Sequence, residues 1–436
     1  MAQPERPPAA EVPGPPAALP SLWHNRDYMG WWTANTVSVL GTSMSAIAYP
    51  LLVLYTTHSV AKAGIITAAY MIGTLATTLW GGALADRVSR KAIMIVGPAI
   101  QAAALAVVAL LVARYRSPIP VLAACAFTSG LAFGLTQGAS TPALRRIVPK
   151  EQQAMATGQE LGRDMAAEII GAPLGGLLFS VTRWLPFAAD AISFLFASAG
   201  AVIIRRPLGP DATTRPRASM VADIRSGISF VRRYRFLRFV IIWVSLFNMV
   251  AQGFILLFIA LVKYRGGGPT TVGLISSVAL IGGVIGAAAG PALLRKIRAR
   301  MVLYAAIWTF VGCFGLVAIA TRPWQIGLIL LVAMLGVAPL NIVLESYLVR
   351  LVPDSFSGRV SAVNRFGALS LQWCGPLLAG VVADQFGPPG GAIALMLMLV
   401  PLALALHVSR SLGVLEQPVE RVAELNVAPA RQTVAS

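Results

Sequence analysis

Long apolar segments recur along the whole chain and are separated by short charged or Pro/Gly-containing breaks. Segments of roughly 20 apolar residues are long enough to cross the hydrocarbon layer of a membrane as helices. The pattern predicts six spans in the first half of the chain, at residues 28–54, 63–84, 92–113, 120–144, 155–181 and 184–204. It predicts six more in the second half, at 239–262, 271–294, 301–321, 324–349, 360–386 and 391–407. The expected fold is an all-α membrane protein with twelve transmembrane helices in two six-helix bundles.

The breaks divide the chain into five parts. Residues 1–27 are rich in Pro and Ala and lack a basic start followed by an apolar run, so we expect a disordered cytoplasmic tail without a cleavable signal. The two bundles are expected at 28–204 and 239–409. A basic cytoplasmic linker at 205–238 joins them, and a cytoplasmic tail follows at 410–436.

Composition and charge agree with a membrane location. Hydrophobic residues make up 57% of the chain, charged residues 12%, and the mean hydropathy is +0.73, which excludes a soluble domain of this length. The formal net charge is +18, and 26 Lys and Arg lie in the tails and loops on the side of the two termini, against 7 in the opposite loops. This asymmetry predicts that both termini and the linker are cytoplasmic, and no nucleic-acid partner is expected.

The two halves contain an internal repeat. The segment 144–149 matches 348–353 in its Leu, Arg, Val and Pro positions, and the same offset places Gly171 on Gly375 and Gly176 on Gly380. A second alignment sets Gly64 against Gly273. Parallel repeats of this kind are one construction that transporters use, so the two bundles are expected to be pseudo-symmetric.

The break between the second and third spans carries the most specific motif, Gly82-Ala-Leu-Ala-Asp86-Arg87-Val-Ser-Arg90-Lys91. It resembles the loop signature of the major facilitator superfamily, with Ser89 in place of the usual second glycine. Three further segments, 48–53, 190–194 and 352–360, resemble the exporter branch that includes macrolide and siderophore (enterobactin-type) efflux carriers. The resemblance covers the chain from about residue 26 to residue 407.

The resemblance implies a conformational latch made by Gly82, Asp86, Arg87, Arg90 and Lys91. In the family this loop meets the start of the eleventh helix, here residues 361–365, and the contact favours the outward-open state. The carboxylate of Asp86 can accept hydrogen bonds from the N-terminus of a facing helix, while the basic residues bind carbonyls or acids nearby. Alternatively, the basic residues serve only to fix the topology.

Ionisable residues inside a span are costly, at about 2.5–3.5 kcal/mol each on insertion scales, and the fifth span holds four of them. Glu160, Asp164 and Glu168 recur every fourth residue on one helical face, and Arg163 lies beside them at a spacing that allows ion pairing to Glu160 or Asp164. One hypothesis is that Glu168 or Glu160 carries a coupling proton. The other is a structural cluster in which Arg163, together with Arg365, holds the two halves together at their cytoplasmic ends.

Two isolated acids are further candidates for proton coupling. Asp190 lies in the sixth span near its outer end, where water is close, and we expect a structural or interfacial role for it. Glu345 follows Asn341 on one face of the tenth span and is a candidate contact for a cationic group of the substrate.

Small residues and prolines mark candidate helix contacts. The fifth span ends in Gly171-Ala-Pro173-Leu-Gly175-Gly176, which resembles the antiporter signature of the superfamily, and its repeat is Gly375-Pro376-Leu-Leu-Ala-Gly380. Small residues spaced four apart permit close approach of helices. Gly282, Gly286 and Gly290 repeat that spacing in the eighth span and predict a tight contact between the halves.

The resemblance implies that the first, fourth, seventh and tenth helices line the transport path. Their aromatic and amide residues suit an amphipathic molecule. The cavity candidates are Asn35, Tyr49, Phe133, Gln137, Trp243, Asn248, Gln252 and Asn341.

The sequence therefore predicts a proton-coupled secondary exporter of drugs, macrolides or siderophores in the inner membrane. The alternatives are a proton-coupled uptake symporter and a non-transporting receptor or scaffold. No nucleophile motif, phosphate-binding loop or metal-ligand spacing occurs, so neither an enzyme nor a cofactor or metal is expected. The expected partners are the lipid bilayer, a small-molecule substrate and protons, and the protein is expected to act as a monomer.

Overall fold

The computed structural model describes residues 21–85, 88–204, 220–417, 419–422 and 425. Helices dominate these residues, and none of them forms a strand. The helices of the first half are α1 (Arg26–Thr57), α2 (Val60–Ala85), α3 (Arg90–Ala113), α4 (Ile119–Ile147), α5 (Gln153–Val181) and α6 (Leu185–Ile203). Those that follow are α7 (Met220–Arg233), α8 (Arg235–Tyr264), α9 (Pro269–Lys296), α10 (Ala299–Ile319), α11 (Pro323–Leu335), α12 (Val337–Leu351), α13 (Asp354–Ser370) and α14 (Cys374–Val408). Short 3-10 helices occur at Leu22–His24, Lys150–Gln152, Arg410–Glu416 and Val419–Arg421.

Among the described residues, eleven helical stretches are long and apolar enough to cross a membrane, and the longest of them contains two spans. This stretch, Asp354–Val408, has 55 residues, far more than the roughly 20 that one crossing needs. The chain bends within α14 at Gly387, whose φ of 73° lies in the left-handed region that glycine adopts at little cost. Pro388 and Pro389 follow the bend and prevent the first arm of α14 from continuing as a straight helix. The expectation of twelve transmembrane helices is thus consistent with the fold.

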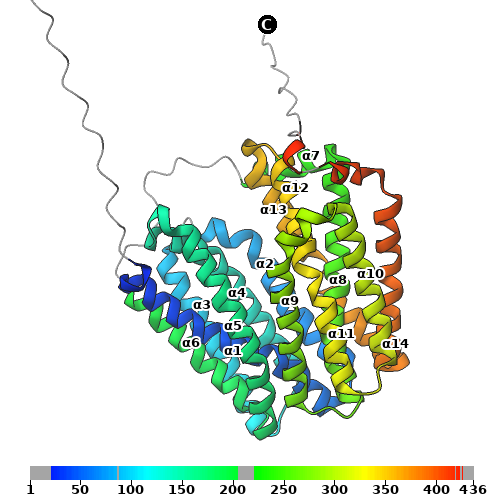
Figure 1. Cartoon of the computed structure of the whole chain (residues 1–436). Helices are drawn as coiled ribbons and strands as arrows, with labels where there is room; N and C mark the ends of the chain where they lie inside the picture. The colour runs from blue at the N-terminus through cyan, green and yellow to red at the C-terminus, as the bar shows by residue number, and fades with distance from the viewer. Residues whose placement is uncertain (1–20, 86–87, 205–219, 418, 423–424, 426–436) are drawn as a thin grey trace, which may run out of the picture.

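Each half of the chain packs into its own group of helices (Figure 1). In the first half, α2 packs against α4, and α6 packs against both α1 and α3. In the second half, α14 packs against α8 and α10, while α9 packs against α11 and α12. The tenth span is divided between α11 and α12 at Gly336, which lies between the two helices.

The part expected to be a linker contains a helix, α7, in its described residues. This helix is short and charged, so it gives no membrane-span signal, but its Phe230 ring stacks on Phe356 of α13 at 4.7 Å between centroids. Gly227 packs closely against the backbone of Arg359, also on α13. Figure 1 shows α7 lying across the end of the second half. The first part of the predicted linker, 205–219, lies outside the described residues, as do residues 1–20 of the predicted N-terminal tail.

The chain beyond α14 docks on the second half. Tyr347 and Arg350 of α12 donate hydrogen bonds to the carbonyl oxygens of Gln417 and Val422, at 2.6 and 3.2 Å. Leu412 and Leu415 are buried, at 0% and 1% exposure. We call the described residues between 409 and 425 the C-terminal strap.

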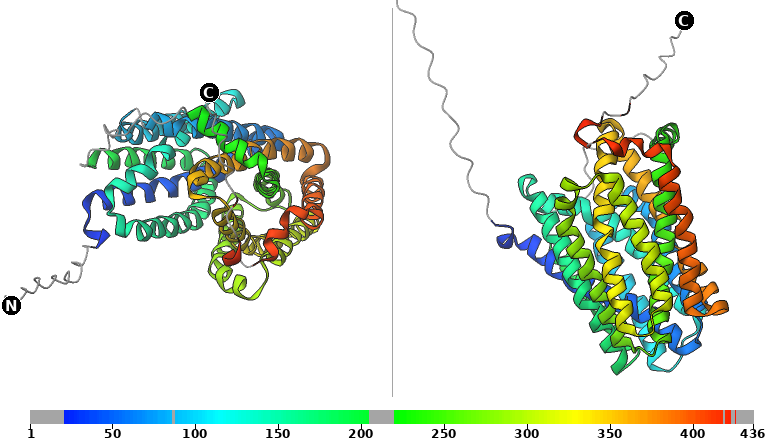
Figure 2. Two further views of the ribbon diagram at one scale, coloured as in Figure 1. Left: turned by 90° about the horizontal axis from the view of Figure 1, so that it is seen from above. Right: turned by 45° about the vertical axis from the view of Figure 1, so that its right-hand side comes forward.

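The molecule has two ends, which we call the terminal face and the distal face. The terminal face holds the start of α1, the end of α14 and α7, whereas the distal face holds the α1–α2, α3–α4, α5–α6, α8–α9 and α10–α11 connections and the Gly387 bend. In Figure 1 and the right-hand view of Figure 2, the helices of the two halves converge toward the distal face and diverge toward the terminal face. The contacts between the halves therefore concentrate on the distal side.

Candidate translocation pathway

The first of two helix pairs that join the halves is formed by α2 and α14. Gly64 lies against the backbone carbonyl of Pro376, and Gly380 lies against the backbone of Val60 and Ala61. A side chain at either glycine would collide with the partner's backbone, so the small residues permit this close approach.

The second pair, formed by α5 and α9, repeats the same construction. Gly176 lies against the carbonyl of Pro269, and Gly273 lies against the backbone of Ala172 and Pro173. The Ser277 hydroxyl of α9 also donates to the carbonyl oxygen of Ile169 of α5, at 2.5 Å. The glycines that the sequence repeat aligned, 64 with 273 and 176 with 380, thus occupy corresponding contacts, and the interface has the pseudo-symmetry of the repeat.

The remaining glycines and prolines of the motifs at 171–176 and 375–380 either pack within one half or belong to the α2–α14 and α5–α9 contacts. Gly171 and Gly175 lie against the α1 backbone, at Leu40 and Met44, and Gly375 lies against Met249 of α8. Pro173 and Pro376 are the residues that the opposing glycines contact.

The glycine row of the eighth span does not join the halves, contrary to the sequence prediction. Gly282 and Gly286 contact the α11 backbone at Leu331 and Leu335, and Gly290 contacts Ile342 of α12. These three residues lie on a different side of α9 from Gly273 and Ser277, which face the first half. Residue spacing predicted a close helix contact but could not identify the partner.

On α5, Arg163 is held within the first half. Its Nε and Nη2 atoms both donate to Asp164 Oδ1, at 2.9 and 2.7 Å. The guanidinium lies 5.3 Å from the Trp31 ring centroid and 6.0 Å from that of Trp32, both on α1. Arg365 of α13 is exposed and forms no ion pair within the described part of the chain, so the two arginines do not bridge the halves in this conformation.

Glu168 occupies a different side of α5 from the apolar surface. Successive helical residues are rotated by about 100°, so Glu168 lies roughly 200° from Ile170. Ile170, Leu177 and Val181 form an exposed apolar stripe, at 55%, 48% and 66% exposure. The carboxylate of Glu168 is also exposed, between the α5 positions that contact α1 and those that contact α9. An exposed carboxylate opposite the apolar stripe is expected to face water between the halves, because contact with hydrocarbon is costly.

Other predicted polar residues share this exposure in mid-span. Asn341 and Glu345 are both exposed and lie four residues apart on one face of α12. Gln137 of α4 is exposed, while Glu160 of α5 and Gln252 of α8 are half-buried. These residues supply further accessible polar groups from both halves.

Asp190 is buried rather than close to water, which corrects the sequence expectation. It is 2% exposed and lies in the contact between α6 and α1, where Gly41 leaves room for its carboxylate. Its Oδ1 atom accepts a hydrogen bond from the Ser193 hydroxyl at 3.0 Å. The helix pattern placed this residue near the outer end of a span but could not reveal how closely α1 covers it.

Several predicted cavity residues serve packing instead. Trp243 is buried, stacks on Phe247 at 5.3 Å between centroids, and donates from Nε1 to the Leu402 carbonyl at 3.0 Å. Asn248 donates to the Ala368 carbonyl at 3.2 Å. Tyr49 packs edge-on against Phe187 at 4.9 Å.

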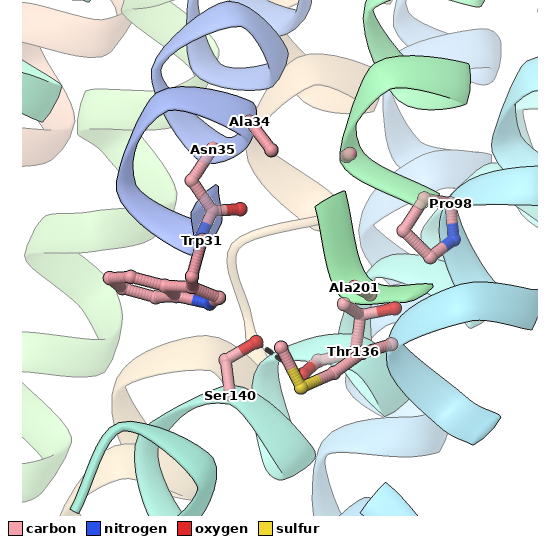
Figure 3. Close-up of a pocket in the computed structure, with 9 residues that line it drawn as sticks. Trp31, Ala34, Asn35, Pro98, Thr136, Ser140 and Ala201 are labelled. Atoms are coloured by element: carbon pink, nitrogen blue, oxygen red, sulfur yellow. Dashed lines mark hydrogen bonds between the residues drawn. The ribbon is translucent and has the colours of Figure 1, made fainter. Parts of the chain in front are cut away.

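Asn35 lines a small cavity inside the first half rather than between the halves (Figure 3). Trp31 and Asn35 of α1 face Thr136 and Ser140 of α4 across this cavity. Phe133, also on α4, is half-buried beside Tyr70, at 6.1 Å between ring centroids. Both residues therefore contribute to the interior of the first bundle.

The predicted latch is described only in part. Asp86 and Arg87 lie outside the described residues, as do the surroundings of Gly82. Lys91, at the start of α3, donates from Nζ to the carbonyl oxygen of Ile204 at 2.7 Å. This contact stabilises the C-terminal end of α6 within the first half. Arg90 is half-buried at the first position of α3.

Two contacts between the halves were not predicted from the sequence at all. Asp384, on the first arm of α14, accepts hydrogen bonds from the N-terminal end of α2 at the distal face. Lys263 of α8 likewise donates to the carbonyl oxygen of Leu54 of α1. A single acid near the end of a span gives no periodic signal, so only the packing of distant helices reveals its partner.

The architecture is that of a multi-pass membrane transporter with two pseudo-symmetric helical halves around exposed polar groups. Comparison with known sequences identifies the family: the Major Facilitator Superfamily model matches residues 31–371. The chain therefore belongs to the Major Facilitator Superfamily.

Two kinds of relative are similar over much of the chain. The multidrug efflux pump Tap of Mycobacterium tuberculosis is 26% identical over 392 residues, which cover 84% of this chain and 89% of Tap. Macrolide efflux protein A of Streptococcus pyogenes is 26% identical over 269 residues, 58% of this chain and 64% of that protein.

Solved structures share the fold. The nucleoside transporter NupG matches with a TM-score of 0.71 at 13% identity, over 88% of this chain and 98% of NupG. A bacterial homologue of the iron transporter ferroportin, in an inward-facing state, matches with a TM-score of 0.65 at 15% identity, over 89% and 100% of the two chains.

Proposed function

We propose that the protein exports small amphipathic molecules of the drug, macrolide or siderophore type across the inner membrane in exchange for protons. The observation that carries the proposal is the position of Glu168, an exposed mid-span carboxylate beside the contact between the two halves. The efflux functions in the names of Tap and macrolide efflux protein A support export as the direction.

The terminal face is proposed to be the cytoplasmic face. The excess of Lys and Arg in the tails and loops on this side supports that orientation. The described conformation, in which the halves pack together at the distal face, is then the one open to the cytoplasm. Substrate enters from the cytoplasm in this state and leaves after the halves have rocked to open the distal face.

The accessible polar groups favour a substrate with a cationic group. Among the described residues, Glu168 and Glu345 are exposed mid-span carboxylates, and Arg365 of α13 is an exposed cation. In the state open to the cytoplasm, Glu168 releases its proton to water, and its carboxylate attracts the cationic group. In the opposite state the carboxyl takes up a proton, which weakens that attraction and favours release of the substrate.

Two measurements test this function. Expression in a strain that lacks its native pumps is expected to protect cells against dyes and macrolides. In everted vesicles, Glu168→Gln is expected to reduce substrate-dependent proton movement at least tenfold, because an amide cannot carry the proton. Glu151→Gln, at an exposed acid on the terminal face, serves as the control and should leave the rate unchanged.

The outcomes discriminate between the alternatives. Unchanged substrate-dependent proton movement in Glu168→Gln would remove this residue from coupling. Cells that become more sensitive and accumulate the compound would indicate uptake instead of export. The absence of any solute movement in vesicles would indicate a receptor or scaffold.

A further inference from the structure

The carboxylate of Asp384 lies across the interface from the N-terminal end of α2. Its Oδ2 atom accepts hydrogen bonds from the Ser59 hydroxyl at 2.6 Å and from the Ala61 amide at 3.2 Å. Its Oδ1 atom accepts from the Val60 amide at 2.7 Å. These donors are more than three hundred residues away in sequence and belong to the other half of the molecule.

The chemistry of a helix N-terminus explains why a carboxylate binds here. The first amides of a helix have no partners within the helix, and α2 begins at Val60. The helix dipole places partial positive charge at this end, so a carboxylate is favoured over a neutral acceptor. Asp384 thus satisfies donors that would otherwise require water when the distal face closes.

The corresponding position in the other helix pair lacks an acid. The repeat offset places Ser180 of α5 opposite the start of α9, and the Ser180 hydroxyl donates instead to Leu177 of its own helix at 2.7 Å. The first helical residue of α9 is Pro269, which has no amide hydrogen to satisfy. Among the described residues, the carboxylate contact is therefore confined to the α2–α14 pair.

We propose that Asp384 locks the distal gate, the closed contact between the two halves at the distal face. Its carboxylate must release the N-terminus of α2 before the halves can open on the distal face. The inference rests on the proposed two-state transport cycle. The glycine contacts at 64 and 380 bring the helices together, and Asp384 adds the polar contact that sets how long they stay closed. A variant without the carboxylate keeps both helices and their glycines, so it should alter the equilibrium between states rather than the fold.

The test measures the distance across the distal face. Spin labels at Arg116, in the α3–α4 connection, and Trp324, at the start of α11, report on the separation of the halves in reconstituted protein. Both positions are exposed. Asp384→Ala is expected to raise the ratio of distal-open to distal-closed molecules roughly fivefold, the effect typical of losing a charged helix cap. Asp384→Asn should produce a smaller shift, because the amide oxygen can still accept one hydrogen bond.

Ser180→Ala, the pseudo-symmetric control, is expected to leave the distance distribution unchanged. Combining Ser59→Ala with Asp384→Ala should add less than the sum of the two single effects, because the residues share one contact. A parental distance distribution in Asp384→Ala, or additive effects in the double variant, would overturn the proposal. A shifted distribution in protein that transports none of the tested compounds would leave the lock intact and refute the proposed function instead.

Discussion

At the scale of single residues, the interior of the first half compensates the charge of Arg163 in two ways. Asp164 accepts two hydrogen bonds from the Arg163 guanidinium, and the rings of Trp31 and Trp32 lie at cation–π distances from the same guanidinium. Desolvating an arginine is expensive unless its charge is paired, so these contacts allow Arg163 to be buried where α5 packs on α1. The sequence predicted pairing with a neighbouring acid from helical spacing, but it carried no information on the aromatic partners, which come from a distant helix.

Replacing Arg163 tests this role. Arg163→Ala removes the stacking and the ion pair, and we expect a loss of about 1–2 kcal/mol in stability, discounted because the Asp164 side chain is 40% exposed. Arg163→Lys keeps the charge but loses the planar stacking and the paired hydrogen bonds, so it should be intermediate. Thermal unfolding in detergent provides the measurement. Equal stability of all three proteins would show that the cluster does not hold α5 in place.

At the scale of elements, the spans were predictable and the segments that cover their ends were not. The predicted span 360–386 covers the end of α13 and the first arm of α14, and the predicted span 391–407 lies in the second arm, beyond the bend at Gly387. Both the apolar length and the Gly-Pro-Pro break are visible in the sequence. The amphipathic helix α7 and the C-terminal strap are short and polar, so neither gives a span signal. Their structure follows from contacts with α12 and α13 that become available only after the second half has formed.

The C-terminal strap is expected to stabilise the terminal-face ends of α10 and α12. Arg300, near the start of α10, pairs with Glu416, and the Leu425 amide donates to the Leu351 carbonyl at 2.9 Å. Truncation after Val408 removes these contacts and uncovers the apolar surface beneath Leu412, so the thermal midpoint should fall by several degrees. A chain that ends at Leu425 keeps every described strap contact and should unfold like the full-length protein. If the chain truncated after Val408 had the same thermal midpoint as the full-length protein, the strap would contribute no stability.

At the scale of the whole molecule, two pseudo-symmetric helix pairs close the distal face. The internal repeat predicted two related halves, and it aligned the glycines that meet across the interface. It could not indicate that Gly282 and its neighbours pack within one half, or that Asp384 makes the two helix pairs unequal. Both properties depend on which helix faces which, and residue spacing in one helix does not contain that information.

Replacing one interfacial glycine with a larger residue should impair closure of the distal face without preventing folding. Gly380→Val places a branched side chain against the α2 backbone at Val60 and Ala61, where overpacking is costly, so the distal-closed state is expected to become rare. Because a transporter must visit both states, transport should fall at least tenfold while the protein still folds, since α5 and α9 retain their own contact. Gly283→Val, at a position with open space around it, is the matched control and should retain most transport. Spin-label distances across the distal face and vesicle transport, measured on the same preparations, distinguish a loss of closure from a loss of folding. A Gly380→Val protein that closes and transports like the parent would show that tight packing of α2 on α14 is not needed for closure.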